Sequence, residues 1–107
     1  MDKVLALLGF ASKAGKLSYG FDAVCTALSQ KKSKLLLIAN DVSSKSKKET
    51  MFFAQKAKTE VIVLDDCDME KLSHAVGRKC GIISVNDSAF SQGLISAISV
   101  GRNLNDK

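Results

Sequence analysis

A glycine, a carboxylate and a hydroxyl group cluster at the start of a predicted short helix. The helix begins after Gly20 and carries Asp22 and Thr26 one turn apart on the same side. A helix N-terminus presents free backbone N–H groups and the positive end of the helix dipole, and both attract anions. Five lysines nearby add to this attraction: Lys13, Lys16, Lys31, Lys32 and Lys34. The stretch therefore suits the docking of a polyanion.

Signatures of catalysis are missing from the chain. Its seven glycines fit neither the GxGxxG pattern nor a Walker A loop, and neither GxSxG nor HExxH occurs. The only histidine, His74, lies on a predicted helix beside Ala75 and Val76, which is typical of a half-buried or surface position. We therefore expect no catalytic residue, no enzyme activity and no small-molecule substrate.

Metal and disulfide chemistry are not indicated either. Cys25, Cys67 and Cys80 are too far apart for a CxxC pair, and an odd number does not suggest a disulfide framework. We expect each cysteine to be a small, partly buried apolar residue with a free thiol, as is usual in a reducing cytoplasm. Four carboxylates follow the third predicted strand: Asp65, Asp66, Asp68 and Glu70. Asp68 as a helix N-cap and Glu70 in the first helical turn account for two of them, and no EF-hand glycine follows. We expect no metal and no cofactor.

The size and composition indicate one soluble domain spanning residues 1–107. The chain is 46% hydrophobic and 25% charged, and no apolar run approaches the roughly 18–20 residues that a membrane span needs. The N-terminus is no secretory signal, because Asp2 adjoins Lys3 and the apolar residues recur at helical spacing. We expect a cytoplasmic monomer with no membrane partner.

Charge is distributed unevenly along the chain. Residues 1–58 hold eleven lysines against four acidic residues, a net charge of +7, whereas residues 59–107 hold five basic and seven acidic residues, a net charge of −2. A basic face on a small domain favours nucleic acid as the partner. An anionic membrane, an acidic protein partner and a merely solvated surface are the alternatives.

Helical and strand patterns alternate along the sequence. We expect helices over residues 3–14, 20–31, 43–58, 68–76 and 87–101, and strands over residues 16–19, 35–39, 61–64 and 82–85. Leu35 to Ala39 is an unbroken apolar run, which predicts a central strand covered on both faces. The third helix is expected to use Met51, Ala54 and Ala57 for the core. The predicted fold is α/β, a three-layer α/β/α sandwich with a four-stranded mixed, mostly parallel sheet.

Several stretches, in this order and spacing, resemble one known family. They are LGFASKAGKLSYGFDAV near the N-terminus, LLLIANDVSS followed by a basic helix, and LSHAVGRKCGIISV followed by DSAF. Together they resemble the kink-turn RNA-binding ribosomal-protein family, and more narrowly its small bacterial YlxQ-type members. The resemblance covers residues 3–100. It implies an α/β/α sandwich that binds structured RNA without catalysis, with ribosomal RNA as one candidate.

The resemblance also implies where RNA would bind. Members of the family recognise a sharply bent internal loop with tandem sheared G·A pairs and an extruded base. Three segments would make the contacts: the start of the second helix, the strand exit leading into the third helix, and the loop before the fourth strand. The predicted RNA-binding set is Lys16, Gly20, Phe21, Asp22, Ala23, Thr26, Lys34, Asn40, Asp41, Ser43, Lys47, Arg78, Lys79 and Cys80.

The chain departs from the family where bases are read. Many archaeal and eukaryotic members have an Asn-Glu pair and a lysine one turn later, where this chain has Asp22, Ala23 and Thr26. The resemblance therefore implies a kink-turn-type domain, ribosomal or ribosome-associated, with altered specificity. A protein-interaction adaptor binding an acidic partner is the alternative. The RNA hypothesis requires Gly20, Lys47 and Arg78 to lie on one rim of the sandwich.

Overall fold

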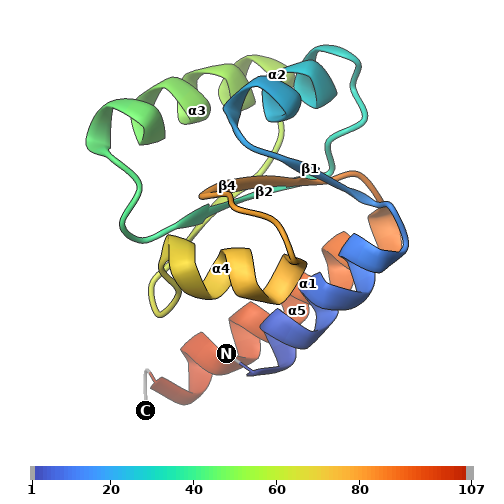
Figure 1. Ribbon diagram of the computed structural model, residues 1–107, viewed down its shortest axis with the longest axis vertical. Helices are drawn as coiled ribbons and strands as arrows, with labels where there is room; N and C mark the ends of the chain where they lie inside the picture. The colour runs from blue at the N-terminus through green and yellow to red at the C-terminus, as the bar shows by residue number, and fades with distance from the viewer. Residues whose placement is uncertain (1, 106–107) are drawn as a thin grey trace.

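Helices and strands alternate along the whole chain, as the periodicity predicts (Figure 1). The structure is a computed structural model that describes the backbone of residues 2–105 and the side chains of residues 2–100. Its elements are α1 (Asp2–Lys13), β1 (Leu17–Tyr19), α2 (Phe21–Ser29), β2 (Leu35–Ala39), α3 (Ser44–Ala57), β3 (Val61–Leu64), α4 (Met69–Val76), β4 (Ile82–Val85) and α5 (Ser88–Asn105). Within the described part of the chain, no helix is long and apolar enough to cross a bilayer.

The elements form three layers, which confirms the predicted α/β/α sandwich. Helices α2 and α3 cover one face of the sheet, and α1, α4 and α5 cover the other (Figure 1). Leu36 and Leu37 of β2 are completely buried between these layers. Leu8 of α1 and Leu94 of α5 are also completely buried, and they belong to the same core cluster. The sheet is therefore held on both sides by apolar packing.

The strand order is β1-β4-β2-β3. Every residue of β2 and β4 is buried, so the prediction of a central strand over 35–39 is confirmed. At the edges, β1 has only three residues, and β3 alternates half-buried with buried positions. In the register, Leu37 lies opposite Ile83 of β4 and Ile62 of β3.

The sheet is mixed as predicted, but the expected majority of parallel pairs is not found. Only β2 and β3 pair in parallel, whereas β4 is antiparallel to both β1 and β2. Strands β1, β2 and β3 do run in one direction, as helix-linked strands usually do. After α4 the loop before β4 folds back against that helix through Ser73 and Cys80, so β4 begins at the end of the sheet where β2 stops. The reversed β4 then inserts between β1 and β2 and makes two of the three pairs antiparallel.

Local signals placed most helix ends correctly. Ser43, Asp68 and Asp87 act as N-caps, their side chains accepting the N–H groups of Ser46 (3.2 Å), Lys71 (2.8 Å) and Phe90 (2.8 Å). The expected end of the last helix at Gly101 is wrong, because α5 continues to Asn105. A single glycine weakens a helix by only about 1 kcal/mol, which the adjoining turns can tolerate.

The core face of α3 differs from the prediction at one position. Thr50 and Ala54 are buried and Ala57 is half-buried, whereas Met51 is 42% exposed. Positions 50, 54 and 57 lie on one helical stripe, and position 51 lies beside it. Residue type alone favoured the methionine, but the threonine occupies the packed stripe, with its hydroxyl donating to the Ser46 carbonyl at 2.8 Å.

Candidate nucleic-acid interface

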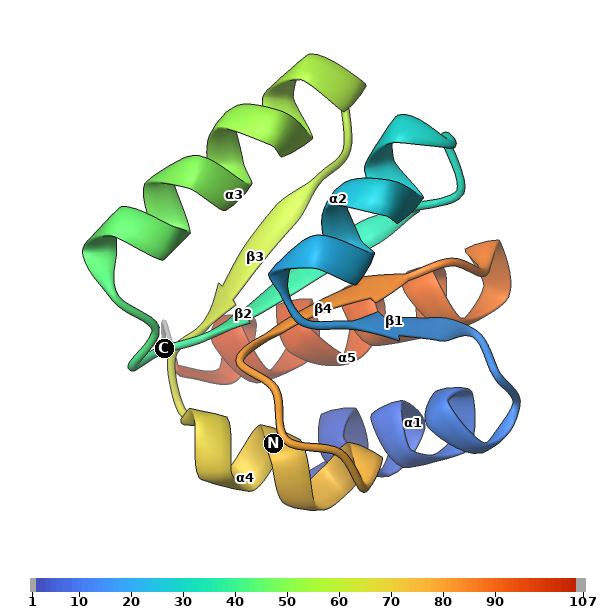
Figure 2. The ribbon, with the colours of Figure 1, turned by 45° about the horizontal axis from the view of Figure 1, so that its top comes forward.

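Three segments that are distant in the sequence meet at one end of the sheet, where β1 and β2 finish and β4 begins. The Gly20 N–H donates to the Ile82 carbonyl oxygen (2.9 Å), and the Ala39 N–H donates to the Gly81 carbonyl oxygen (2.9 Å). These bonds join the ends of β1 and β2 to the beginning of β4. We call the surface formed by residues 20–26, 40–47 and 77–81 the rim, and Figure 2 shows its three segments at the end of the sheet where β1 and β2 finish and β4 begins.

Gly20 sets the direction in which α2 leaves the rim. Its backbone has φ 84° and ψ 164°, a region that essentially only glycine adopts. No side chain caps α2, so the first-turn N–H groups have neither a helical acceptor nor a side-chain acceptor. The side chains of Asp22, Ala23 and Thr26 are exposed beside them. This helix start therefore offers donors to an anion or to a base.

The start of α3 supplies the second part of the rim. The Ser43 hydroxyl caps the helix, and the Lys47 ammonium donates to the Asn40 carbonyl oxygen at 3.0 Å. No acidic residue lies in the first turn of this helix. Two further lysines in this part of α3 are exposed, Lys45 and Lys48. Cations at a helix N-terminus oppose the helix dipole, and an anionic ligand would offset that repulsion.

Asn40 and Asp41 hold the strand exit in place. The Asn40 side-chain amide donates to the Asp65 carbonyl oxygen (2.8 Å), and the Asp41 carboxylate accepts the Met69 N–H (2.8 Å). Both side chains are thus engaged within the protein, and they connect the end of β2 to the turn after β3 and to the start of α4. Their role in the rim is to position Lys47 rather than to present free groups.

The loop before β4 supplies the third part of the rim. The Arg78 guanidinium carbon lies 4.9 Å from the ring centroid of Tyr19, a cation–π contact that places it beside the start of α2. Lys79 is exposed and lines a shallow pocket with Asp41 and Glu70 on the α4 side. Of the two cations in this loop, Lys79 therefore has carboxylates beside it, whereas Arg78 lies against an aromatic ring.

Cys80 offers no free group to a ligand. It is 7% exposed, its N–H donates to the Ser73 hydroxyl (2.9 Å), and that hydroxyl donates to the Cys80 carbonyl oxygen (3.0 Å). Burial raises the pKa of its thiol above the ordinary value. Within the rim, Cys80 therefore holds the loop against α4 and presents no group of its own to a ligand.

Two of the predicted RNA-binding lysines lie at the other end of the sheet. The Asn86 N–H donates to the Lys16 carbonyl oxygen, and the Lys34 N–H donates to the Val85 carbonyl oxygen, both at 2.8 Å. Val85 is the last residue of β4 and Asn86 follows it, so both lie at the end of the strand away from Ile82. Lys16 and Lys34 are therefore not brought together with Gly20, Lys47 and Arg78, which do share the rim.

Tyr19 borders the rim, and the predicted RNA-binding set does not include it. Its ring lies under Arg78, and its hydroxyl hydrogen-bonds the Ser12 hydroxyl at 2.5 Å. The Ser12 hydroxyl in turn donates to the Val76 carbonyl oxygen at 2.8 Å, which ties β1 to the end of α4. The available signal was a tyrosine directly before the glycine that opens α2.

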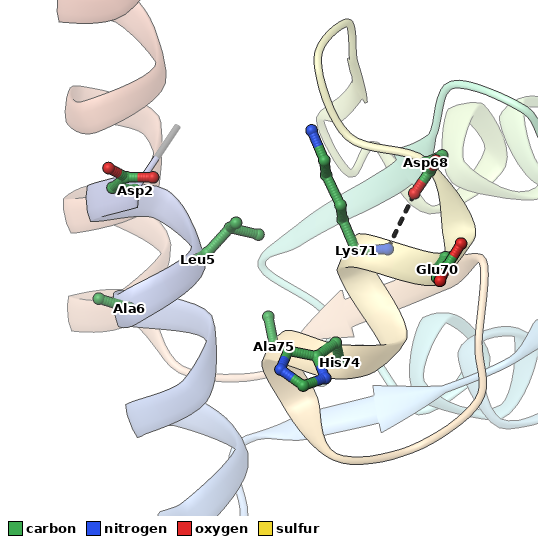
Figure 3. A pocket seen from close by; sticks show the side chains of 8 residues that line it. All are labelled: Asp2, Leu5, Ala6, Asp68, Glu70, Lys71, His74 and Ala75. Carbon is green, nitrogen blue, oxygen red and sulfur yellow. Dashed lines mark hydrogen bonds between the residues drawn. The ribbon is translucent and has the colours of Figure 1, made fainter.

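A pocket between α1 and α4 contains the only histidine but no converging catalytic set (Figure 3). His74 is exposed, and the Asp68 carboxylate accepts the Lys71 N–H at 2.8 Å, so it serves the helix cap. Within the described residues, no three His, Cys, Asp or Glu side chains come close enough to hold a metal ion. The pocket therefore does not compete with the rim as a functional site.

Known proteins resemble this chain over most of its length. The model of the ribosomal protein L7Ae/L30e/S12e/Gadd45 family matches residues 2–95. The large ribosomal subunit protein eL30 of Yarrowia lipolytica is 33% identical over 100 residues, covering 92% of this chain and 91% of that protein. The RNA-binding protein YlxQ of Enterococcus faecium is 24% identical over 90 residues, covering 84% of this chain and 85% of that protein.

A solved structure shares the fold. The structure of a protein with unknown function from Bacillus halodurans superposes with a TM-score of 0.86 at 27% identity, covering 92% of this chain and 99% of that one. Its fold therefore matches nearly every element described above.

Proposed function

Since this chain belongs to the ribosomal protein L7Ae/L30e/S12e/Gadd45 family, we propose that it is a single, non-enzymatic domain that binds structured RNA through the rim. The RNA is a kink-turn or a related bent internal loop, and the protein acts as a cytoplasmic monomer on or near the ribosome. The convergence of Gly20, Lys47 and Arg78 at one end of the sheet carries the proposal. The similarity to the large ribosomal subunit protein eL30 and to the RNA-binding protein YlxQ supports it.

The rim suits a bent RNA better than a regular helix. Side chains cannot read the deep major groove of A-form RNA, whereas a kinked loop exposes base edges and brings phosphates from two directions. The uncapped start of α2 would donate to phosphate or base acceptors. Lys47 and Arg78, on either side of it, would supply attraction that does not depend on sequence.

A gel-shift comparison tests the proposal. One RNA carries a kink-turn, and the matched RNA carries the same sequence with its G·A pairs disrupted. We expect the protein to bind the kink-turn RNA more tightly, and we expect purified protein to carry nucleic acid that nuclease removes. Absence of binding to every RNA, with no nucleic acid co-purifying, would favour the adaptor with an acidic protein partner.

Replacing Lys47 with alanine is expected to weaken binding to all RNAs to a similar degree. The substitution removes one ammonium near the phosphates, so the slope of log K against log salt should become shallower by about one unit. Titrations at several salt concentrations measure this. Lys34→Ala is the matched control, because Lys34 is exposed but lies at the far end of the sheet, and it should change neither affinity nor slope. Equal effects of the two substitutions would contradict the assignment of the rim.

A further inference from the structure

A groove lies between α2 and α3, the two helices whose starts belong to the rim, and it is lined by lysines. Its floor includes Leu28 of α2, and Phe53 of α3 lines its wall. Three cations line it as well, Lys31, Lys56 and Lys58, and all three side chains are exposed. No acidic residue is among the residues that line it. The groove is therefore apolar at its base and positive at its mouth, which matches an anionic chain that also carries flat apolar groups.

Two of these lysines occupy strained backbone positions. Lys31 has φ 58° and Lys58 has φ 57°, and among the described residues they are the only non-glycine residues with positive φ. Glycine is the usual residue where a helix ends in this conformation. The helix dipole accounts for a cation near each helix end, but it does not require that cation at the left-handed position itself. Both positions instead place a lysine on the same groove.

Exposed aromatic rings connect this groove to the rim. Phe52 is 54% exposed and Phe53 is 39% exposed, and their ring centroids lie 5.5 Å apart. Phe53 also contacts Phe21, the first residue of α2, with ring centroids 6.1 Å apart. The Lys56 ammonium lies 4.8 Å from the centre of the Phe52 ring. A path of rings and cations thus runs from the rim into the groove.

We propose that the groove binds a single-stranded segment that continues from the RNA held at the rim. Bases would stack on Phe52 and Phe53, and phosphates would lie beside Lys31, Lys56 and Lys58. Aromatic side chains beside cations are the usual means of binding single-stranded nucleic acid without sequence preference. This inference rests on the proposed function, because the rim supplies the RNA from which the strand continues.

Two carboxylates restrict the route of this strand. Asp22 and Glu49 lie near Cys25, where burial, and then the charges of these two side chains, raise the pKa of the thiol. Phosphates are repelled at this point, so a base rather than a phosphate should lie over Cys25. Glu49→Gln should accordingly strengthen binding of the extended RNA.

The test compares a kink-turn RNA with the same RNA carrying a single-stranded extension of about eight nucleotides at either end, a length within the range of known single-strand sites. We expect one extension to raise the affinity of the natural protein about tenfold, as a stacked base can. Phe52→Ala, and Lys31→Gly together with Lys58→Gly, should abolish that gain and leave the affinity for the unextended RNA unchanged. Lys13→Ala, on α1 in the opposite helical layer, should retain the gain.

Folding controls and a footprint keep the outcomes distinct. Glycine adopts the left-handed conformation without strain, so the two Lys→Gly substitutions should not lower Tm.

Cys25 lines the groove, whereas Cys67 and Cys80 are buried, so alkylation at about pH 9, near the ordinary thiol pKa, reports on the groove. The extended RNA should protect Cys25 and the unextended RNA should not. Binding of the unextended RNA with no gain from either extension, or a gain without protection, would overturn the inference, whereas failure of both RNAs to bind would overturn the proposed function.

Discussion

Replacing Gly20 with alanine is expected to lower the affinity for structured RNA at least about tenfold and to destabilise the fold by about 1–3 kcal/mol. The reason is the backbone, because Gly20 adopts φ 84° and ψ 164°. A Cβ atom there would meet nothing within 4 Å, so steric contact does not contribute. Alanine must rotate the backbone out of this region, and the first turn of α2 must turn with it. The free N–H groups would then no longer face the ligand.

Gly15→Ala is the matched control for this substitution. Gly15 also has positive φ, 72°, and a Cβ atom there would likewise meet nothing within 4 Å. It precedes β1 at the end of the sheet opposite the rim. Chemical denaturation and RNA titration should show that both substitutions reduce stability, but that only Gly20→Ala reduces affinity. A comparable loss of affinity in both proteins would mean that stability, not the direction of α2, controls binding.

A second expected result is a gain in discrimination when Ala23 becomes glutamate and Thr26 becomes lysine. The pair introduces the carboxylate and the ammonium that the family resemblance implies for these positions. A well-placed pair of hydrogen bonds to a base contributes about 1–3 kcal/mol of discrimination, so the preference for intact G·A pairs should rise roughly tenfold to a hundredfold. Both side chains are exposed, and a glutamate in the first turn suits the helix dipole, so stability should not fall.

The single substitutions separate base reading from simple attraction. Thr26→Lys alone adds a cation and should strengthen binding to intact and disrupted RNAs alike. Ala23→Glu alone adds an anion and should weaken binding to the disrupted RNA. Only the double substitution should increase the ratio of the two affinities, measured by titration at one salt concentration. An unchanged ratio would show that the bound RNA does not present a guanine edge to the start of α2.

Local patterns in the sequence were sufficient to place the elements of the fold. The unbroken apolar run Leu35–Ala39 identified the central strand, and Asp68 and Asp87 identified two helix starts. The direction of β4 could not be read in this way. The loop before β4 folds back onto α4, where Ser73 and Cys80 hydrogen-bond each other, and β4 starts at the end of the sheet where β2 stops.

The site was predicted less completely than the fold. Lys34 precedes β2 and Asn40 follows it, so they lie at opposite ends of a strand of five residues, about 16 Å long, although they are close in the sequence. The reversed β4 brings together residues that are distant in the sequence, because it places Arg78 at the end of the sheet that also holds Gly20. In a wholly parallel sheet, the loop before β4 would lie at the opposite end of the strands, and the rim would lack its third segment.

The way the three rim segments are tied together has a consequence for engineering. The bonds at Gly20 and Ala39 use main-chain N–H and carbonyl groups, and every residue except proline supplies both. Asp22, Ala23 and Thr26 stand exposed on this frame. Ligand preference can therefore drift, or be selected from a library randomised at these three positions, while most members still fold.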